Sequence, residues 1–176
     1  QVIRGYIVKS EKVLFEGDGY SEAWEKEAAK RGLPNVKSTP LSLDAYTSDK
    51  AKKLFEDNNI YNHLELDARH EIMLEAYVKK VQIEARVMGD LASTYIIPAA
   101  IKYQNSLLEN IKGMKELGLE ASVYKTQLDI VKKVSEHINT ITSNVTSMIE
   151  ARKKANEIED QRTKAIAYCD EVKQKH

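Results

Sequence analysis

From Asn62 onward the chain carries apolar side chains at alternating steps of three and four residues. That spacing places them on one face of an α-helix, because a helix turns once in about 3.6 residues. The first series comprises Leu74, Tyr77, Val81, Ala85, Met88, Ala92, Tyr95 and Ala99. Asn62 and Glu65 have capping-box spacing, so we expect this helix to begin at Asn62. Pro98 lacks an amide hydrogen and clashes with the carbonyl of Thr94, which predicts a kink.

A second series of the same kind follows a turn that we place between Gly113 and Gly118. Its members are Val131, Val134, Ile138, Ile141, Val145 and Met148. Each pair of successive steps in this series advances by about seven residues, and a seven-residue repeat is typical of coiled coils. The series continues less regularly through Ala155, Arg162, Ala165, Cys169 and Val172. We therefore predict two helices of about 50 residues each, joined as a long antiparallel hairpin over residues 62–176.

Residues 1–61 follow a different pattern, because most of the glycine and proline residues lie there. Ser21 and Ser48 are predicted to cap short helices, and Thr39 with Pro40 to start another. The apolar runs in residues 2–15 are too short to distinguish a strand from a helix, so one short strand is an alternative. The predicted fold class is all-α, with short N-terminal helices followed by a long helical hairpin or bundle. We divide the chain into a short-helix segment, 1–61, and a helical domain, 62–176.

Composition narrows the classes of function. The 27 basic residues balance 27 acidic ones, which argues against a partner held by bulk charge, such as nucleic acid or an anionic membrane. The single cysteine, Cys169, excludes an internal disulfide and a cysteine-based zinc site. No apolar run is long enough to span a bilayer, and no signal pattern follows Gln1, so we expect a cytoplasmic protein. The absence of helix-stop residues near His176 leads us to expect a fragment of a longer protein.

One motif approaches a phosphate-binding loop without completing it. Gly17, Asp18 and Gly19 precede a predicted helix, but Glu22 stands where a third glycine is required. An anion could bind at the start of that helix. We favour the alternative of an ordinary turn followed by a helix cap at Ser21.

The histidines offer an equally incomplete metal site. His63 and His70 lie two helical turns apart, with Asp67 between them. The zinc-protease pattern that His70 would begin needs a second histidine at position 74, which is Leu74. Solvated or capping histidines are the alternative that we favour over a metal site.

The remaining polar clusters have structural explanations. The basic residues 152–154 lie among acidic ones, which favours a solvated helix face over a nucleic-acid contact. Tyr77, Tyr95 and Tyr103 are expected to be packing residues, and Cys169 to behave as a small apolar side chain. We therefore assign no catalytic, no cofactor-binding and no metal-ligating residue in this chain.

Several blocks of the sequence resemble one enzyme family. The run FEGDGYS, residues 15–21, leads into EAWEKEAAKRGLPN and resembles the C-terminal region of type III glutamine synthetases, the large bacterial form. So do EARVMGDLASTYIIPAAIKYQN (84–105), MIEARKKANEIED (148–160) and AYCDEVK (167–173). The likeness extends over nearly all 176 residues but carries no chemical motif.

The resemblance implies a parent enzyme that joins ammonia to glutamate, uses ATP with magnesium or manganese, and forms a ring-shaped homo-oligomer. In that family the catalytic groups lie upstream, so residues 1–61 would be the tail of the catalytic domain and 62–176 a truncated C-terminal helical domain. This chain would then be non-catalytic and structural, with the catalytic domain and further copies as its partners. An independent, coiled-coil-like helical adaptor is the alternative. In either case Ile138→Asp is predicted to disrupt the hairpin or its association, at a cost of about several kcal/mol.

Overall fold

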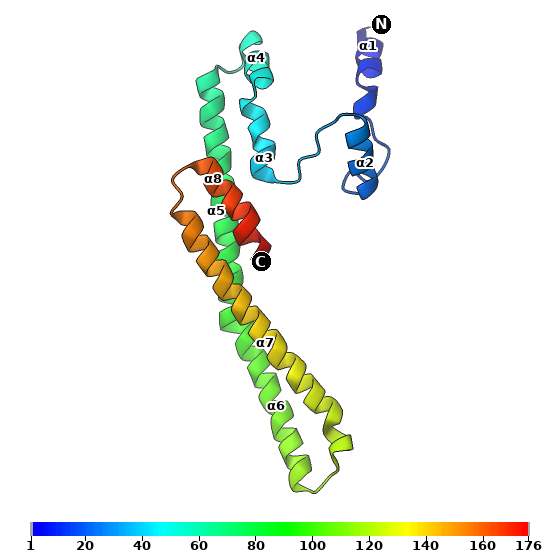
Figure 1. The fold of residues 1–176 in the computed structure, drawn as a ribbon, viewed down its shortest axis with the longest axis vertical. Helices are drawn as coiled ribbons and strands as arrows, with labels where there is room; N and C mark the ends of the chain where they lie inside the picture. Colours follow the sequence, from blue (N-terminus) through cyan, green and yellow to red (C-terminus); the bar gives the residue numbers. More distant parts are fainter. Residues whose placement is uncertain (1, 176) are drawn as a thin grey trace.

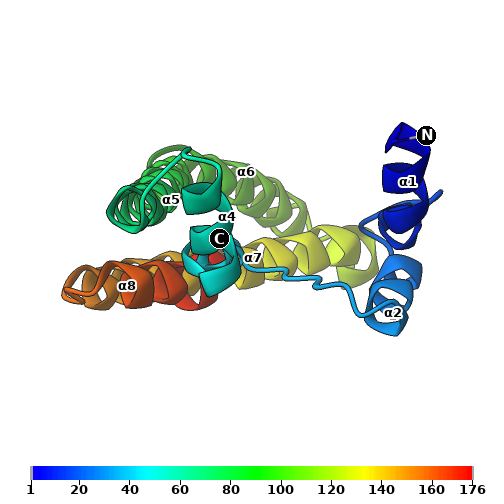
Figure 2. The same cartoon turned by 90° about the horizontal axis from the view of Figure 1, so that it is seen from above.

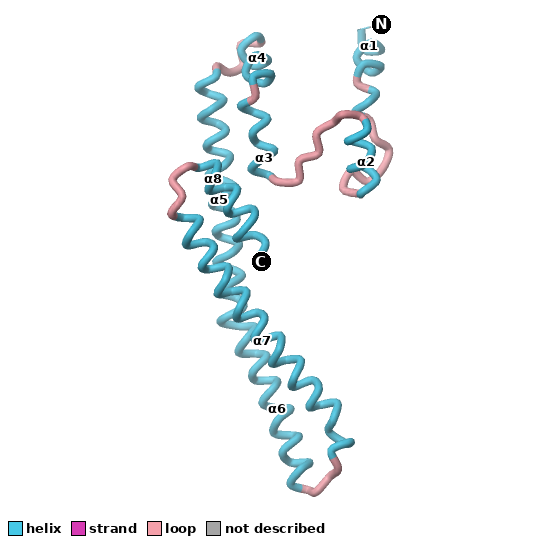
Figure 3. The backbone as a smooth tube through the Cα atoms, in the orientation of Figure 1, coloured by secondary structure: helices cyan, strands magenta, loops and turns pink. Residues whose placement is uncertain are grey.

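The computed structural model describes residues 2–175, and within them the fold is helical without strands. This confirms the all-α prediction. The alternative of a short strand in residues 2–15 is wrong, because α1 (Val2–Lys9) and a 3₁₀ turn (Glu11–Val13) occupy that region. Nowhere in the described chain is there a strand that could lie beside residues 2–15 and supply the pairing that a strand requires (Figure 3).

Three short helices follow, and local capping residues explain where they begin. Ser21 accepts a hydrogen bond from the amide of Trp24 at the start of α2 (Glu22–Lys30), and Ser48 caps α4 (Asp49–Asp57) in the same way. Between them lies α3 (Thr39–Leu43), whose cap position is Ser38, one residue earlier than predicted. Gly32, with φ +67°, ends the α2 segment in the left-handed conformation that glycine adopts without strain.

A continuous helix of 54 residues forms the long axis of the molecule (Figure 1). It consists of α5 (His63–Leu91), a π-helical turn (Ala92–Ile96) and α6 (Ile97–Glu116). The predicted capping box is present, because the Asn62 and Glu65 side chains each accept a hydrogen bond from the other residue's amide. Figure 1 shows the helix axis changing direction between α5 and α6, as the prediction of a kink near Pro98 requires.

The π-helical turn changes which side chains face the core. The predicted stripe holds at Leu74, Val81 and Ala85, which are buried, but Tyr95 within the turn and Ala99 beyond it are exposed. Placing those two in the stripe was wrong. The wider turn adds one residue to the repeat, since the Ile97 amide donates to the Ala92 carbonyl five residues earlier. The inward face of α6 is instead formed by Ile97, Ala100, Gln104, Leu107 and Ile111.

The hairpin turn lies at Gly118, where the chain adopts φ +76°. The Gly118 amide donates to the Lys115 carbonyl and the Leu119 amide to that of Met114, a Schellman motif that closes α6. Gly113 lies inside α6 rather than in the turn. From there α7 (Ala121–Asn156) runs back along α6 and α5, so the antiparallel hairpin is confirmed (Figure 1).

The predicted second helix of about 50 residues is wrong, because the chain reverses after residue 156. Here α7 ends, and the Asp160 side chain accepts a hydrogen bond from the Thr163 amide to start α8 (Gln161–Ala167). A second π-helical turn (Tyr168–Val172) and a 3₁₀ turn (Lys173–Lys175) complete the described chain. These last elements fold back onto α5 and α7.

The hydrophobic core lies where α5, α7 and the returning C-terminal segment meet. Its buried members are Leu74, Val78, Val81, Ala85, Met148, Ala155, Ala165, Tyr168 and Val172. Toward the hairpin tip the seam between α6 and α7 is shallower, and Val134 and Ile138 are half-buried there. At the other end α1 and α2 lie apart from the rod, joined to it by the loop before α3 (Figures 1 and 2).

Candidate functional site

Asp44 connects three parts of the fold near the α8 end of the rod. It lies in the 3₁₀ turn Asp44–Thr47, and its carboxylate accepts two hydrogen bonds from Arg162 of α8, 2.9 Å from Nε and 2.7 Å from Nη2. On the other side, Nε2 of the buried His70 in α5 lies 3.5 Å from Asp44 Oδ1. The two-point contact with Arg162 fixes the direction of both side chains. We call Asp44, His70 and Arg162 the interhelical clamp.

The electrostatics of the clamp favour an ionised Asp44. Hydrogen bonds from Arg162 hold the pKa of the Asp44 carboxyl below its ordinary value of 3.8, and the charges of Arg162 and His70 act in the same direction. Partial burial opposes them. The spacing that places Arg162 on the apolar stripe is misleading, and that placement is wrong, because the side chain is exposed and bound to Asp44.

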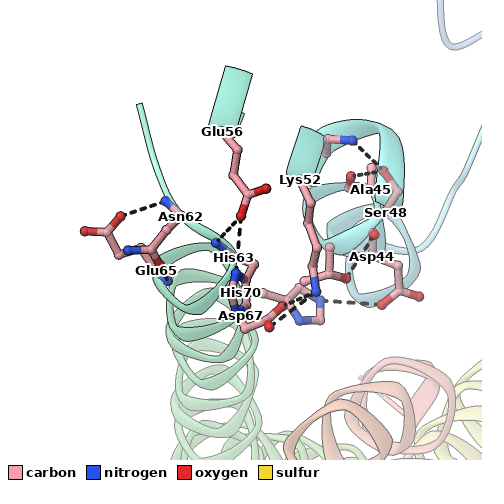
Figure 4. Close-up of polar contacts among 12 residues, drawn as sticks. Asp44, Ala45, Ser48, Lys52, Glu56, Asn62, His63, Glu65, Asp67 and His70 are labelled. Carbon is pink, nitrogen blue, oxygen red and sulfur yellow. Dashed lines mark hydrogen bonds and ion pairs between the residues drawn. The ribbon is translucent and has the colours of Figure 1, made fainter. Parts of the chain in front are cut away.

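Each residue of the incomplete metal site contacts a different partner outside that site (Figure 4). His63 lies with Nδ1 3.2 Å from Oε1 of Glu56, and Asp67 lies 3.0 Å from Nζ of Lys52. His70 points to Asp44 instead. Among residues 2–175 no three histidine, cysteine, aspartate or glutamate side chains gather as they would around a metal ion.

The glycine motif before α2 forms a turn and cap. The Asp18 carboxylate accepts a 2.9 Å hydrogen bond from the Tyr20 amide. The Ser21 hydroxyl donates to the Asp18 carbonyl at 2.6 Å and accepts from the Trp24 amide at 3.3 Å. The arrangement is therefore the turn-and-cap alternative favoured by the sequence, since the capping hydroxyl is used within the loop.

The tyrosines differ in position. Tyr77 is half-buried in the core beside the Cys169 thiol, and burial raises the pKa of its hydroxyl above 10.0. Tyr95 and Tyr103 are exposed by 67% and 53%, so the packing role predicted for them is not found within this chain. Cys169 itself is half-buried, with Sγ 3.7 Å from the Ser38 hydroxyl.

A polar network in the core has no counterpart in the sequence reasoning. The fully buried Tyr168 donates a 2.7 Å hydrogen bond to Oδ1 of Asn156, which also accepts from Nε2 of Gln82 at 3.2 Å. These residues lie on three different segments, as do the members of the clamp. No local motif marks such groups, because their proximity depends on the reversal of the chain after α7.

An apolar groove of about 610 Å³ lies between α5 and α7, beside the first π-helical turn. Its walls include Ile83, Val87 and Leu91 on one side and Val145 on the other, and Lys175 lies at its rim. Val87 and Leu91 are exposed by 51% and 48%, which is high for large apolar side chains in a helix pair. Glu84 and Lys175 are the two charged residues that line the groove, and the other lining side chains are apolar, so its chemistry suits packing.

Comparisons with known proteins all point to one family, the glutamine synthetases. The profile of the glutamine synthetase C-terminal domain matches residues 1–115. A glutamine synthetase from Bacteroides fragilis (strain YCH46) is 43% identical over 176 residues, covering 98% of this chain and 24% of the relative. A type-3 glutamine synthetase from Dictyostelium discoideum is 32% identical over 154 residues, covering 88% and 20%. A glutamine synthetase from Butyrivibrio fibrisolvens is 30% identical over 155 residues, covering 88% and 22%.

The chain spans less than a quarter of the length of these relatives. None of the helices in the described part of the chain has a stretch of sufficient length and hydropathy to pass through a lipid bilayer.

Proposed function

This chain belongs to the glutamine synthetase C-terminal domain family, and we propose that it is the non-catalytic helical part of a glutamine synthetase, with a structural role in assembly. The parent would ligate ammonia to glutamate with ATP and magnesium or manganese. Those groups would bind upstream of this chain, because the residues described above are engaged in caps, a clamp and a packed core. The upstream catalytic domain and further copies of the parent would be its partners.

The observation that carries the structural role is the large surface of the chain. A compact protein of 20.0 kDa exposes about 8,700 Å², whereas this chain exposes 13,040 Å². The excess is about 4,300 Å², several times the roughly 800 Å² that one partner contributes to a standard interface. A surface of this size supports a chain that functions within a larger assembly.

Helix α1 supports the upstream domain as one of these partners. Val2, Ile3 and Tyr6 are exposed by 74%, 76% and 70%, so this helix shows apolar side chains to solvent when the chain stands alone. It also begins at the end of the chain to which an upstream domain would be joined. A covalently attached domain acts at a high effective concentration, which favours its packing on α1.

The test compares glutamine formation by this chain, by the upstream remainder of the parent and by the intact parent, each with ATP and magnesium. We expect glutamine from the intact parent and none from this chain. Turnover by this chain alone would refute the non-catalytic role, and an inactive intact parent would refute the ligase. An upstream remainder that is as active and as fully assembled as the intact parent would refute the structural role.

A further inference from the structure

Two segments that meet midway along the rod are almost without charge. Residues 87–101 hold one charged side chain, Asp90, and residues 138–149 hold none. At the chain's average of 31%, these segments of 15 and 12 residues would hold about eight. They meet where the side chains of Met148 and Val145 pack over Gly89. We call the two segments the uncharged belt.

Three threonines of the belt have hydroxyl groups that are already hydrogen-bonded within α7. The hydroxyls of Thr140, Thr142 and Thr146 donate to the carbonyls four residues earlier, at 2.9, 2.7 and 2.9 Å. Each of these donors is therefore satisfied within its own helix. Removing them from water costs less than removing a donor that has no partner in the protein.

The belt contains both a hollow and a projection. The apolar groove described above opens onto it at Val87, Leu91 and Val145. Next to Ile96, which also lines the groove, Tyr95 is exposed by 67%. An aromatic side chain that is apolar along its ring and polar at its tip is typical of interface anchors.

We propose that the uncharged belt is the surface through which two copies of this chain pack on each other about a twofold axis. This inference deepens the assembly role proposed above and rests on it. A twofold interface requires a patch that complements itself, and here the exposed Tyr95 is the chain neighbour of Ile96, which lines the groove. Depletion of charge marks the core of such interfaces and avoids repulsion between like charges of the two copies.

Position and area favour a second copy over the upstream domain as the occupant. The upstream domain would be joined at α1, which lies at the opposite end of the molecule from the hairpin tip and away from the middle of the rod (Figure 1). The excess surface of about 4,300 Å² is large enough for the upstream domain on α1 and for a second partner on the belt.

Photocrosslinking of the full polypeptide tests this arrangement. A benzoylphenylalanine replaces Tyr95, and ¹⁴N- and ¹⁵N-labelled preparations are mixed, dissociated and reassembled before irradiation. We expect crosslinked peptides of mixed isotope that join position 95 to the belt of another copy. The control places the same probe at Tyr20, which is 98% exposed and far along the chain from the belt; it should give no crosslink to a belt.

Each other outcome overturns the proposal. Crosslinks from position 95 to the upstream domain would assign the belt to that partner, and crosslinks to a foreign protein would assign it to a different assembly. No crosslink at all would show that the belt is uncovered. All three results leave the ligase assay above unaffected, so failure of this proposal is distinguishable from failure of the proposed function.

A charge placed in the belt provides the second test. Leu91→Glu alters a side chain that is already 48% exposed in a single copy, so the helix itself should still fold. We expect the crosslinking yield from position 95 to fall about tenfold or more, because the carboxylate must be buried when the copies meet. Val123→Glu is the matched control, since Val123 is 58% exposed and lies outside the belt. An unchanged yield with Leu91→Glu would contradict the twofold packing.

Discussion

Arg162 binds Asp44 through two hydrogen bonds, at 2.9 and 2.7 Å, although the two residues are 118 positions apart. The pair joins the turn after α3 to the start of α8, the element that returns along α5 after the chain reverses. His70 lies against the same carboxylate from α5. The interhelical clamp therefore connects the turn after α3 to both α5 and α8 at the same end of the rod.

The clamp predicts a loss of stability in acid. The pKa of Asp44 is lowered in the folded chain relative to its ordinary value of 3.8, so the folded state favours the ionised carboxylate. Its contribution is fully present above the unfolded pKa and is lost as pH falls through the folded pKa. Urea unfolding between pH 6 and pH 3 should show a smaller acid-dependent loss for Asp44→Asn than for the native chain. Equal pH dependence in the two would refute the clamp's contribution.

The core network predicts two different costs at Tyr168. Tyr168→Phe removes the hydroxyl that donates to Asn156 but keeps the ring, so we expect a loss of about 1 kcal/mol in the free energy of unfolding. Tyr168→Ala also leaves a cavity in the core and should cost about 3–5 kcal/mol. Chemical denaturation measures both. Similar costs for the two variants would show that the ring packs less tightly than its complete burial indicates.

The seam of the hairpin predicts the effect of Ile138→Asp. Ile138 is half-buried between α7 and α6, so an aspartate there would be partly desolvated. We expect a loss of about 2 kcal/mol or more and a lower melting temperature. Lys133→Asp, at an exposed position of the same helix, is the control and should change stability much less. Equal melting temperatures for the two variants would place Ile138 off the seam.

Two glycines near the hairpin tip predict effects of opposite sign. Gly118 has φ +76°, so Gly118→Ala forces an alanine into a strained conformation and should cost about 1 kcal/mol. Gly113 lies within α6 and has open space where the Cβ atom of an alanine would lie, so Gly113→Ala should stabilise the chain by roughly 0.5–1 kcal/mol. Thermal unfolding of both variants measures the contrast, and a shift of the same sign in both would contradict the assignment of the turn.

Local chemistry explains which elements the sequence predicts correctly. The capping box at Asn62 and Glu65 and the caps at Ser21 and Ser48 depend only on residues three positions apart. Such short-range bonds form in the same way whatever the rest of the chain does. The beginnings of α2, α4 and α5 could therefore be read from the sequence.

The sequence-based predictions fail at two places: where a π-helical turn adds a residue to the helical repeat, and where the chain reverses its direction after α7. Pro98 was expected to bend the helix, but the π-helical turn before it also advances the repeat by one residue, which moves Tyr95 out of the seam. The reversal after α7 was missed because the apolar series continues across it, from Ala155 before the reversal to Ala165 and Val172 after it. Periodicity alone does not distinguish one long helix from two that pack on the same core.

The candidate sites depend on contacts that no short motif records. Asp44, His70 and Arg162 come together only after α8 has folded back, and the apolar groove forms only when α7 lies on α5. The charge-poor composition of residues 87–101 and 138–149 was present in the sequence as a signal for the belt. This composition indicates a shared surface only when the fold shows that the two segments lie at the same level of the rod.

The return of α8 also decides where a label can be attached. Lys175 lines the apolar groove, so an affinity tag or fluorophore fused beyond it would lie beside the uncharged belt and compete with a partner for that surface. The loop at Gly118 is the better attachment point. It lies about 40 Å further along α6 from Leu91, at 1.5 Å per residue, and a dye there would report on motion of the rod without covering the belt.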